Sequence, residues 1–344
     1  MTDVTGSAAA QSSTRPGAAQ PRPILPRSVR IEASSHCQLR CPSCPTATGA
    51  IRPAIGSGFL KLTDLRKLLD ENPTLAAIEL SNYGEIFLNP HLLDILALAH
   101  ERQVAVSAVN GVNLNTVRAE VLEAVVKYEL RTMTCSIDGA SPETYKIYRV
   151  RGDFDTVIGN IRKINAHKQR LGSEFPHLRW QFVVFGHNEH ELPAARRMAA
   201  DLGMEFFAKL SWDDDVSPLR DKDAVRQALG VGAATRDEFR ARHGRDYMDG
   251  LCHQLWDSPQ INWDGKVLGC CRNFWGDFGG NAFTDGLAAS LNTETLARAR
   301  AMLQGQAPPR DDIPCTTCSI YIDMQTSGRW LTRPDAPPRP SPAI

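Results

Sequence analysis

Short apolar runs take turns with helical patterns along most of this chain. Apolar residues in one brief run or at every second position predict a strand, whereas apolar residues three or four positions apart predict an amphipathic helix. Six runs are predicted as strands, and each is followed by a glycine, asparagine, aspartate or cysteine turn: Val29–Ala33, Leu75–Leu80, Val104–Val109, Thr132–Ile137, Trp180–Phe185 and Glu205–Leu210. Strands that alternate with helices predict βαβ units and a mainly parallel sheet, so the predicted fold class is α/β.

Turn and capping residues predict where the elements between these strands begin and end. The third strand is predicted to end at Asn110-Gly111. Thr63 and Asn89-Pro90 are predicted to start helices, and a longer helix is predicted over Phe154–Gln169. His187–Glu191 are predicted as cap and first-turn residues of a helix rather than as a metal site. Six βα repeats predict a full or partial barrel or an open sheet, with its active face where the strands end.

The segments outside these repeats have other compositions. Residues 1–26 lack aromatic side chains and residues 332–344 contain five prolines, so both are predicted as tails, the first of them disordered. Residues 216–250 are charged and helical in pattern, which predicts a connector. Residues 251–331 then contain a predicted hairpin turn at Trp263-Asp264-Gly265-Lys266.

Length and charge narrow the classes of function. The 344 residues, 42% of them hydrophobic, suffice to bury a large core. Lysine and arginine together number 39, as do aspartate and glutamate, so the zero net charge disfavours general nucleic-acid binding. No run approaches the roughly 18 to 20 apolar residues of a spanning helix, and the N-terminus lacks the apolar segment of a signal peptide. We expect a soluble, cytoplasmic protein with no membrane partner.

Nine cysteines are too few for a secreted disulfide scaffold, and their clustering indicates metal binding or catalysis. Cys37, Cys41 and Cys44 follow the first predicted strand at the spacing Cys-x3-Cys-x2-Cys. Their soft thiolates favour an iron–sulfur cluster or zinc over hard cations. Three ligands leave one metal position open for a substrate or cofactor, whereas a zinc knot that takes His36 as fourth ligand is the structural alternative.

Cys-x3-Cys-x2-Cys after the first strand is the motif of the radical S-adenosylmethionine (SAM) enzymes, and residues 28–212 resemble that family. The resemblance implies a (β/α)6 partial TIM barrel, placed here at residues 27–215. It also implies that the three cysteines hold a [4Fe-4S] cluster whose free iron binds S-adenosyl-L-methionine. Electrons would come from a donor such as flavodoxin or ferredoxin. One departure is Ser43, because the family usually has an aromatic or large apolar residue directly before the third cysteine.

Other predicted strand ends add candidate cofactor-binding residues to this resemblance. Gly84 and Glu85 resemble the family's Gly-Gly-Glu element, which holds the methionyl ammonium, although Tyr83 stands at its first glycine position. Ser136 matches a family pattern in which a serine meets the cofactor carboxylate or ribose. Arg149 resembles the arginine that often pairs with that carboxylate. Each of these sequences is also common in ordinary loops.

Late cysteines form a second group: Cys252, Cys270, Cys315 and Cys318. Four thiolates can close a tetrahedral zinc site or ligate one [4Fe-4S] cluster, and their spacing does not distinguish the two. Beside a radical SAM barrel, however, the pattern resembles the SPASM/twitch auxiliary domains. That resemblance implies a small C-terminal α+β domain at residues 251–331, which binds a second [4Fe-4S] cluster of the shorter, twitch type.

Two cysteines lie outside both groups. Cys271 directly follows a predicted ligand. Three roles are open for it: a substitute ligand, a hydrogen-atom donor to a product radical, or a small buried residue. Cys135 neighbours Ser136 on a strand, so the two side chains are predicted to point to opposite faces, with Cys135 in the core.

The resemblance implies an oxidoreductase or isomerase-type radical SAM enzyme. It would cleave SAM reductively to a 5′-deoxyadenosyl radical and abstract a hydrogen atom from a small polar substrate, sugar or aminocyclitol-like, giving oxidation or epimerisation. Peptide-modifying relatives frequently have a leader-binding domain, whereas about 27 residues precede the first predicted strand, so a peptide or protein maturase is the alternative. The alternative from another class is a non-catalytic, zinc-binding interaction protein.

Overall fold

The computed structural model describes residues 23–332. Its sheet has eight strands in the order β6-β5-β4-β3-β2-β1-β7-β8. The strands are β1 (Ser28–Ile31), β2 (Ala77–Glu79), β3 (Ala105–Val112), β4 (Thr132–Ser136), β5 (His177–Val184), β6 (Glu205–Leu210), β7 (Gln260–Ile261) and β8 (Val267–Gly269). Strands β1 to β6 pair in chain order and are all parallel. The α/β class and the mainly parallel sheet are therefore confirmed.

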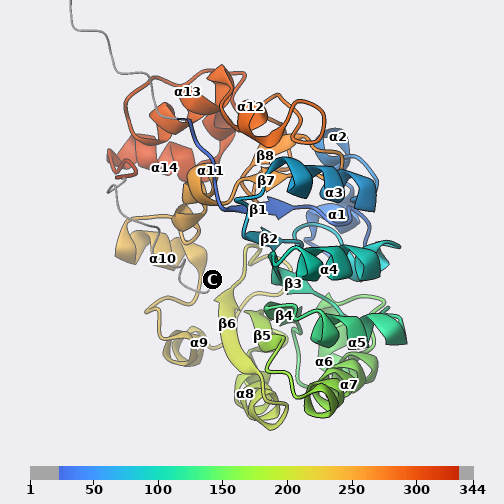
Figure 1. Ribbon diagram of the computed structural model, residues 1–344. Coiled ribbons are helices and arrows are strands. Elements are labelled where there is room, and N and C mark those ends of the chain that lie inside the picture. Colours follow the sequence, from blue (N-terminus) through green and yellow to red (C-terminus); the bar gives the residue numbers. More distant parts are fainter. Residues whose placement is uncertain (1–22, 333–344) are drawn as a thin grey trace, which may run out of the picture.

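Helices connect these strands and cover the sheet (Figure 1). The first seven are α1 (Pro45–Thr48), α2 (Arg52–Ile55), α3 (Leu62–Glu71), α4 (Leu92–Glu101), α5 (Ala119–Lys127), α6 (Pro142–Tyr148) and α7 (Phe154–Leu171). The others are α8 (Leu192–Asp201), α9 (Lys222–Leu229), α10 (Arg236–His243), α11 (Gln254–Asp257), α12 (Leu287–Leu291), α13 (Glu294–Leu303) and α14 (Ser319–Ser327). The predicted long helix is α7, whose apolar face is buried against the sheet and contributes about 1.5–3 kcal/mol for each large side chain.

Alternation along each strand separates an apolar core from a polar inner face. Trp180 and Phe182 of β5 belong to the core and contact Phe206 of β6. Gln181, between them in sequence, points the other way and donates to Ser136 of β4. The inner face contains further buried polar residues: Arg30, Glu32, Glu79, Ser81, Thr134 and Arg179. This polar face at the ends of parallel strands is where an α/β protein places its site.

A hairpin from the last part of the chain continues the same sheet. Strand β7 pairs parallel with β1 and antiparallel with β8, and the predicted turn at Trp263–Lys266 connects β7 to β8. Figure 1 shows the orange and red C-terminal segment beside the blue β1 strand. The sequence analysis placed this segment in a domain of its own and did not predict that its hairpin would join β1, because strand pairing between such distant residues has no local signal.

The N-terminal tail and the Pro-rich C-terminal tail, predicted at residues 1–26 and 332–344, lie outside the described residues except for residues 23–26 and 332. Ile24 exchanges two backbone-to-side-chain hydrogen bonds with Asn292, at 2.7 and 2.9 Å. The first described residues are thus attached to the segment between α12 and α13.

Strand β3 differs from its prediction because it continues through Asn110-Gly111 to Val112. The carboxylate of Glu79, on the neighbouring strand, accepts a hydrogen bond from Val109 N at 2.9 Å and holds the backbone extended. Gly111 has a φ of +127°, and an added Cβ would lie 2.4 Å from Ser136 Oγ. The glycine is therefore required by close contact with β4 rather than by a turn.

Predicted helix starts differ from the observed ones by one or two residues at Thr63 and at Asn89-Pro90. Helix α3 begins at Leu62, without a side-chain cap, so Thr63 lies inside its first turn. Helix α4 begins two residues after Pro90. Asn89 Oδ1 accepts a hydrogen bond from His91 N at 2.8 Å, while its Nδ2 donates to Ala33 O and Leu60 O. Before α8, Asn188 is the N-cap residue of a 3-10 helix, Glu189–Glu191, which runs directly into α8, so the predicted cap and first-turn positions are confirmed. The Asn188 side chain makes no capping hydrogen bond, because it accepts from Phe185 N.

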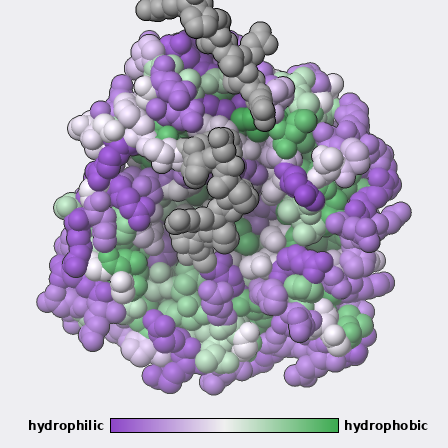
Figure 2. All heavy atoms as spheres, turned by 60° about the vertical axis from the view of Figure 1, so that its left-hand side comes forward, coloured by the Kyte–Doolittle hydropathy of each residue, from purple (hydrophilic) through white to green (hydrophobic). Residues whose placement is uncertain are grey.

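Within residues 23–332 no helix has both the length and the apolar character needed to cross a bilayer. Figure 2 shows one face of the molecule, where hydrophilic residues predominate and apolar residues gather in smaller patches between them.

Candidate active site

The loop after β1 carries the first three cysteines. Cys41 is buried, and Cys37 and Cys44 are half-buried. Their neighbours are apolar and aromatic side chains: Leu39, Tyr148, Val183 and Phe185. Burial raises the pKa of Cys37 to about 12, with a further contribution from Glu85, and burial also raises the pKa of Cys41. Without a cation these two thiols hold their protons, so a bound metal would have to displace them.

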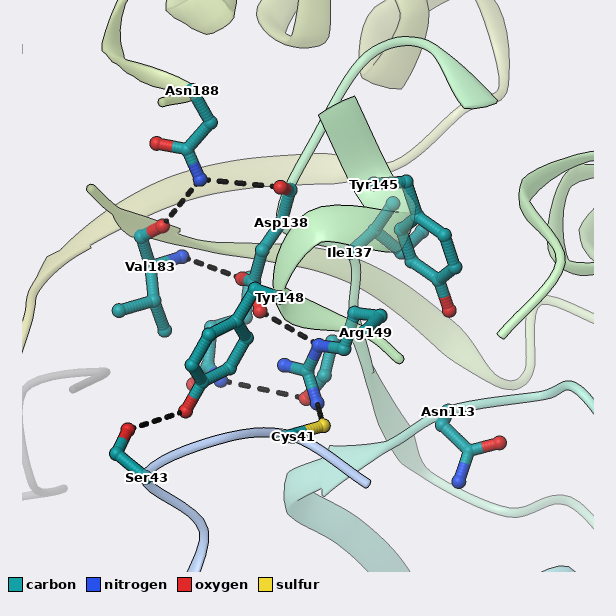
Figure 3. A network of polar contacts seen from close by, with 12 residues as sticks. Cys41, Ser43, Asn113, Ile137, Asp138, Tyr145, Tyr148, Arg149, Val183 and Asn188 are labelled. Carbon is teal, nitrogen blue, oxygen red and sulfur yellow. Dashed lines mark hydrogen bonds and ion pairs between the residues drawn. The ribbon is translucent and has the colours of Figure 1, made fainter. Parts of the chain in front are cut away.

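Two of the three sulfurs face nitrogen donors from distant parts of the chain. Asn113 Nδ2 lies 3.7 Å from Cys37 Sγ. Arg149 Nη1 lies 3.9 Å from Cys41 Sγ, and Figure 3 shows the guanidinium directed at this sulfur. An N–H group that points at sulfur favours thiolate over thiol, and such hydrogen bonds tune the reduction potential of iron–sulfur clusters. The loop therefore has the surroundings of a metal-bound thiolate set.

Arg149, predicted to pair with a cofactor carboxylate, is held by a carboxylate of the chain itself. Its Nε donates to Asp138 Oδ2 at 2.7 Å, and Asp138 Oδ1 accepts from Val183 N at 2.8 Å. Figure 3 shows Arg149 between Asp138 and Cys41. The sequence analysis missed this role of Asp138. Its position at the end of β4, directly after Ile137, is a local signal that could have suggested it.

Asp138→Asn is expected to destabilise the protein because it leaves the Arg149 guanidinium buried without a counter-charge. Loss of one partner of a buried ion pair costs about 3–5 kcal/mol in the free energy of unfolding, and urea titration of the variant would measure this loss. The matched control is Asp70→Asn, which breaks the exposed pair between Asp70 and Arg102 and should cost at most about 1 kcal/mol. Equal losses in the two variants would contradict the proposed role of Asp138.

Gly84 and Glu85 follow β2 and are tied to the loop after β1. Gly84 N donates to Glu32 Oε1 at 3.1 Å, and Glu85 N donates to His36 O at 2.7 Å. The buried Glu85 carboxylate accepts a hydrogen bond from Asn113 N at 2.6 Å. Burial raises the pKa of Glu32 and of Glu85 to about 7. Glu85 thus positions the asparagine whose amide faces the first cysteine sulfur.

Gly84→Ala is expected to disturb the cysteine loop. A Cβ at this position would lie 1.8 Å from Ser34 O and 2.9 Å from His36 N, so the backbone that leads into Cys37 must move. We expect a loss of about 1–3 kcal/mol in urea unfolding. Gly159→Ala, in the middle of α7 with no atom within 4 Å of the new Cβ, should instead stabilise the protein by up to about 1 kcal/mol. Wild-type stability in Gly84→Ala would contradict this packing.

Ser136 ends β4 on the inner face, and the neighbouring Cys135 is fully buried in the core on the other face. Ser136 Oγ accepts a hydrogen bond from Gln181 Nε2 at 3.4 Å. The strand alternation therefore separates these two side chains as the sequence analysis predicted, and it leaves the hydroxyl of Ser136 among the polar residues of the inner face.

Aromatic side chains surround Ser43, although none directly precedes the third cysteine. Ser43 Oγ lies 3.0 Å from Tyr148 Oη, and Trp212 Nε1 donates to Ser43 O at 3.4 Å. The Tyr148 ring in turn packs on Phe185, with 4.5 Å between ring centroids. These rings come from α6, from the residue after β5 and from the segment after β6. The sequence analysis missed them because they lie far from the cysteine motif in the chain.

Four late cysteines line one cavity of about 20 Å³ between the hairpin and α14: Cys252, Cys270, Cys315 and Cys318. Apolar side chains complete its wall, among them Leu255, Phe278, Leu303 and Ile320. Burial raises the pKa of Cys252 and of Cys315 well above the ordinary value, and the neighbouring thiols add to the effect. In the part of the chain that the structure describes, no three His, Cys, Asp or Glu side chains converge tightly enough to hold one metal ion. The four cysteines are thus neighbours around one cavity.

Cys271 lies apart from this cavity. Its Sγ accepts from Gln254 Nε2 at 3.5 Å, and its carbonyl oxygen accepts a hydrogen bond from Tyr83 Oη at 2.8 Å. Tyr83 belongs to the loop that precedes Gly84. The surplus cysteine therefore stands where the late hairpin meets the loop after β2.

Comparisons with known proteins agree with this geometry. Residues 31–197 match the family model of the radical SAM superfamily, and none of the curated proteins matches the chain in sequence. The structure of Streptococcus suis SuiB bound to S-adenosylmethionine has a TM-score of 0.59 at 15% identity, over 86% of this chain and 71% of SuiB. BtrN in complex with AdoMet and 2-DOIA has a TM-score of 0.48 at 13% identity, over 86% and 93%. At such identity the likeness to SuiB shows the fold, and residues 31–197 of this chain form a radical SAM domain of that enzyme superfamily.

Proposed function

We propose that this chain cleaves SAM reductively and uses the 5′-deoxyadenosyl radical to take a hydrogen atom from a small polar substrate. The observation that carries the proposal is the set of nitrogen donors aimed at Cys37 and Cys41 in the loop after β1. A structural zinc knot does not require an open ligand position, whereas a three-cysteine cluster leaves one iron for SAM.

The residues of the first site fit a [4Fe-4S] cluster held by Cys37, Cys41 and Cys44. When bound, the cluster supplies the electron that breaks a carbon–sulfur bond of SAM. Asn113 and Arg149 would donate to the ligand sulfurs, and Asp138 would hold the guanidinium in place. The apolar neighbours of the loop would keep water from the reacting groups.

Residues on the adjoining strand ends are proposed to hold SAM itself. Gly84 has its backbone fixed by Glu32, and Ser136 presents a hydroxyl on the inner face. Glu85 and Arg149 are proposed as further cofactor contacts. Each side chain would contact the cofactor in addition to its present hydrogen-bond partner in the chain. Such preordered groups would orient the cofactor relative to the substrate.

For the late cysteines we propose a second [4Fe-4S] cluster in a twitch-type domain. A zinc site needs four sulfurs about 2.3 Å from a single ion, whereas a cubane is ligated through four separate irons. The four thiols line one cavity with apolar walls, which fits a [4Fe-4S] cluster held by four thiolates. Its role would be to accept an electron from the substrate radical, with a flavodoxin or ferredoxin as reductant of the whole enzyme.

The substrate, a small polar molecule, is proposed to be oxidised or epimerised. The reaction would take place inside a partial barrel. Epimerisation needs a thiol that returns a hydrogen atom, and Cys271, outside the four-cysteine cavity, is the proposed donor. SuiB has been solved with its precursor peptide SuiA, so a peptide is the second candidate substrate. A product analysis with Cys271→Ala would separate oxidation, which needs no thiol, from epimerisation.

Electron paramagnetic resonance tests whether only one of the two proposed clusters binds SAM. After reduction with dithionite, addition of SAM is expected to change the spectrum of one cluster and leave the other unaffected, because only the three-cysteine site has an open iron. A spectrum that does not respond to SAM, in protein with full iron content, would contradict the proposal.

A further inference from the structure

Lys209 lies on the inner face of β6, close to both cysteine groups. It is opposite Val183 in the register of β5 and β6, and Val183 packs against Cys41. Arg236, the Cys271 thiol beside the second group and the Asp138 carboxylate beside the first group all influence the pKa of Lys209. The lysine therefore lies on the same side of the sheet as the proposed cofactor site, opposite Val183 and next to Leu210.

Two arginines extend this positive charge. Arg236, the first residue of α10, donates from Nη2 to Leu210 O at 3.4 Å, while its Nε is buried without a hydrogen-bond partner. Arg272, which follows Cys271, donates from Nη2 to Ser319 Oγ at 3.0 Å, and its Nε is likewise buried and unpartnered. The charge of Arg236 acts on both Lys209 and Arg272.

Carboxylates near these cations are committed elsewhere or exposed. Asp138 already accepts hydrogen bonds from Arg149 Nε and from Val183 N. Asp246 accepts hydrogen bonds from Arg240 Nη2 at 3.1 Å and from Met248 N at 2.8 Å. Asp214 is exposed to solvent.

Among residues 23–332, none of the three cations forms an ion pair, whereas the buried Arg149 has Asp138 as its partner. All three side chains are half-buried. Like charges gathered where water has limited access raise the free energy of the fold unless an anion joins them. The position is therefore arranged for a negatively charged group that residues 23–332 do not supply.

We propose that Lys209, Arg236 and Arg272 bind an anionic group of the substrate, a carboxylate or a phosphate. Arginine forks and a lysine ammonium suit the oxygens of either group. This inference rests on the proposed function, and it narrows the small polar substrate to an acidic one, such as a sugar acid or a sugar phosphate. An aminocyclitol that carries only positive charge would be repelled.

Titration calorimetry of the intact, anaerobically prepared protein with malonate and with inorganic phosphate tests this site without SAM cleavage. At least one anion is expected to bind saturably, and Lys209→Met and Arg236→Met should each weaken it by about tenfold or more. Tighter binding of phosphate would indicate a phosphate ester, and tighter binding of malonate a carboxylate. Lys209→Met should fold as well as the wild type, checked by its melting temperature, because it removes a charge that lacks a partner.

The matched control is Lys266→Met, an exposed lysine of the β7–β8 turn that pairs with Asp264 at 3.4 Å. It should bind the anions as the wild type does. Absence of saturable binding, wild-type affinity in Lys209→Met or Arg236→Met, or an equal loss in Lys266→Met would overturn the proposal. Because SAM cleavage is assayed separately, failure of the anion site is distinguishable from failure of the proposed function.

Anion affinity is also expected to depend on pH. Burial, with a further contribution from Arg236, lowers the pKa of Lys209 to about 8, although Cys271 and Asp138 oppose that shift. The ammonium form attracts the anion, so affinity should be fully present below this value and fall as the pH rises through it. Lys209→Met should remove that fall, and calorimetry between pH 7 and pH 9 would measure it. An unchanged pH profile in Lys209→Met would contradict the assignment to this lysine.

Discussion

Cys41→Ala is expected to abolish the formation of 5′-deoxyadenosine and to lower the iron content by about four atoms per chain. Cys41 is the buried member of the first cysteine loop, and Arg149 is directed at its sulfur. Without this ligand the cluster retains only two protein thiolates. The effect is the largest we expect, because every later step of the proposed reaction needs the radical. Iron analysis and quantification of the nucleoside by mass spectrometry measure it.

The control for this variant is Cys135→Ala. Cys135 is also fully buried, but it lies in the core on the opposite face of β4 from Ser136. It should keep both the iron content and the nucleoside formation of the wild type. Full nucleoside formation in Cys41→Ala would contradict the assignment of the catalytic cluster.

Cys315→Ala is expected to remove the second cluster and, with it, product formation. Cys315 lines the cavity that it shares with three other cysteines, so its loss should lower the iron content by about four atoms per chain. Nucleoside formation should persist, because the first cysteine loop follows β1 and shares no ligand with this cavity. The variant thus separates cofactor cleavage from the use of the radical.

Cys271→Ala serves as the comparison for iron content alone. Cys271 lies next to Cys270 in sequence, yet its sulfur faces Gln254 rather than the cavity. Its replacement should leave the iron content at the wild-type value. If Cys315→Ala kept all its iron, or if it lost nucleoside formation together with the iron, the proposal of two independent clusters would be wrong.

The order of elements was predictable from the sequence, because period-two and helical patterns are local. All six parallel strands occur where predicted, and β6 spans the predicted residues Glu205–Leu210. The errors concern tertiary contacts. The carboxylate of Glu79 extends β3 beyond its predicted turn, and the Asn89 side chain also connects the segment before α4 to two distant backbone oxygens. The pairing of β7 with β1 likewise depends on residues more than 200 positions apart.

The candidate site was predictable only where its residues are close in sequence. The cysteine motif is such a case, since three thiols fall within eight residues. Asn113 and Trp212 reach the loop from other strand ends, and no local pattern indicates them. Glu32 offered a weak signal as an acidic residue in an apolar strand. Lys209 and Arg236 have charges that look like ordinary surface charges until the fold places them together.

Iron, sulfide and zinc content after anaerobic purification, measured together with 5′-deoxyadenosine formed from SAM and dithionite, tests the central claim most directly. The account predicts about eight irons and eight sulfides per chain, little zinc and measurable nucleoside. Zinc without iron, and no nucleoside, would contradict it and would leave a zinc-binding protein built on a radical SAM fold.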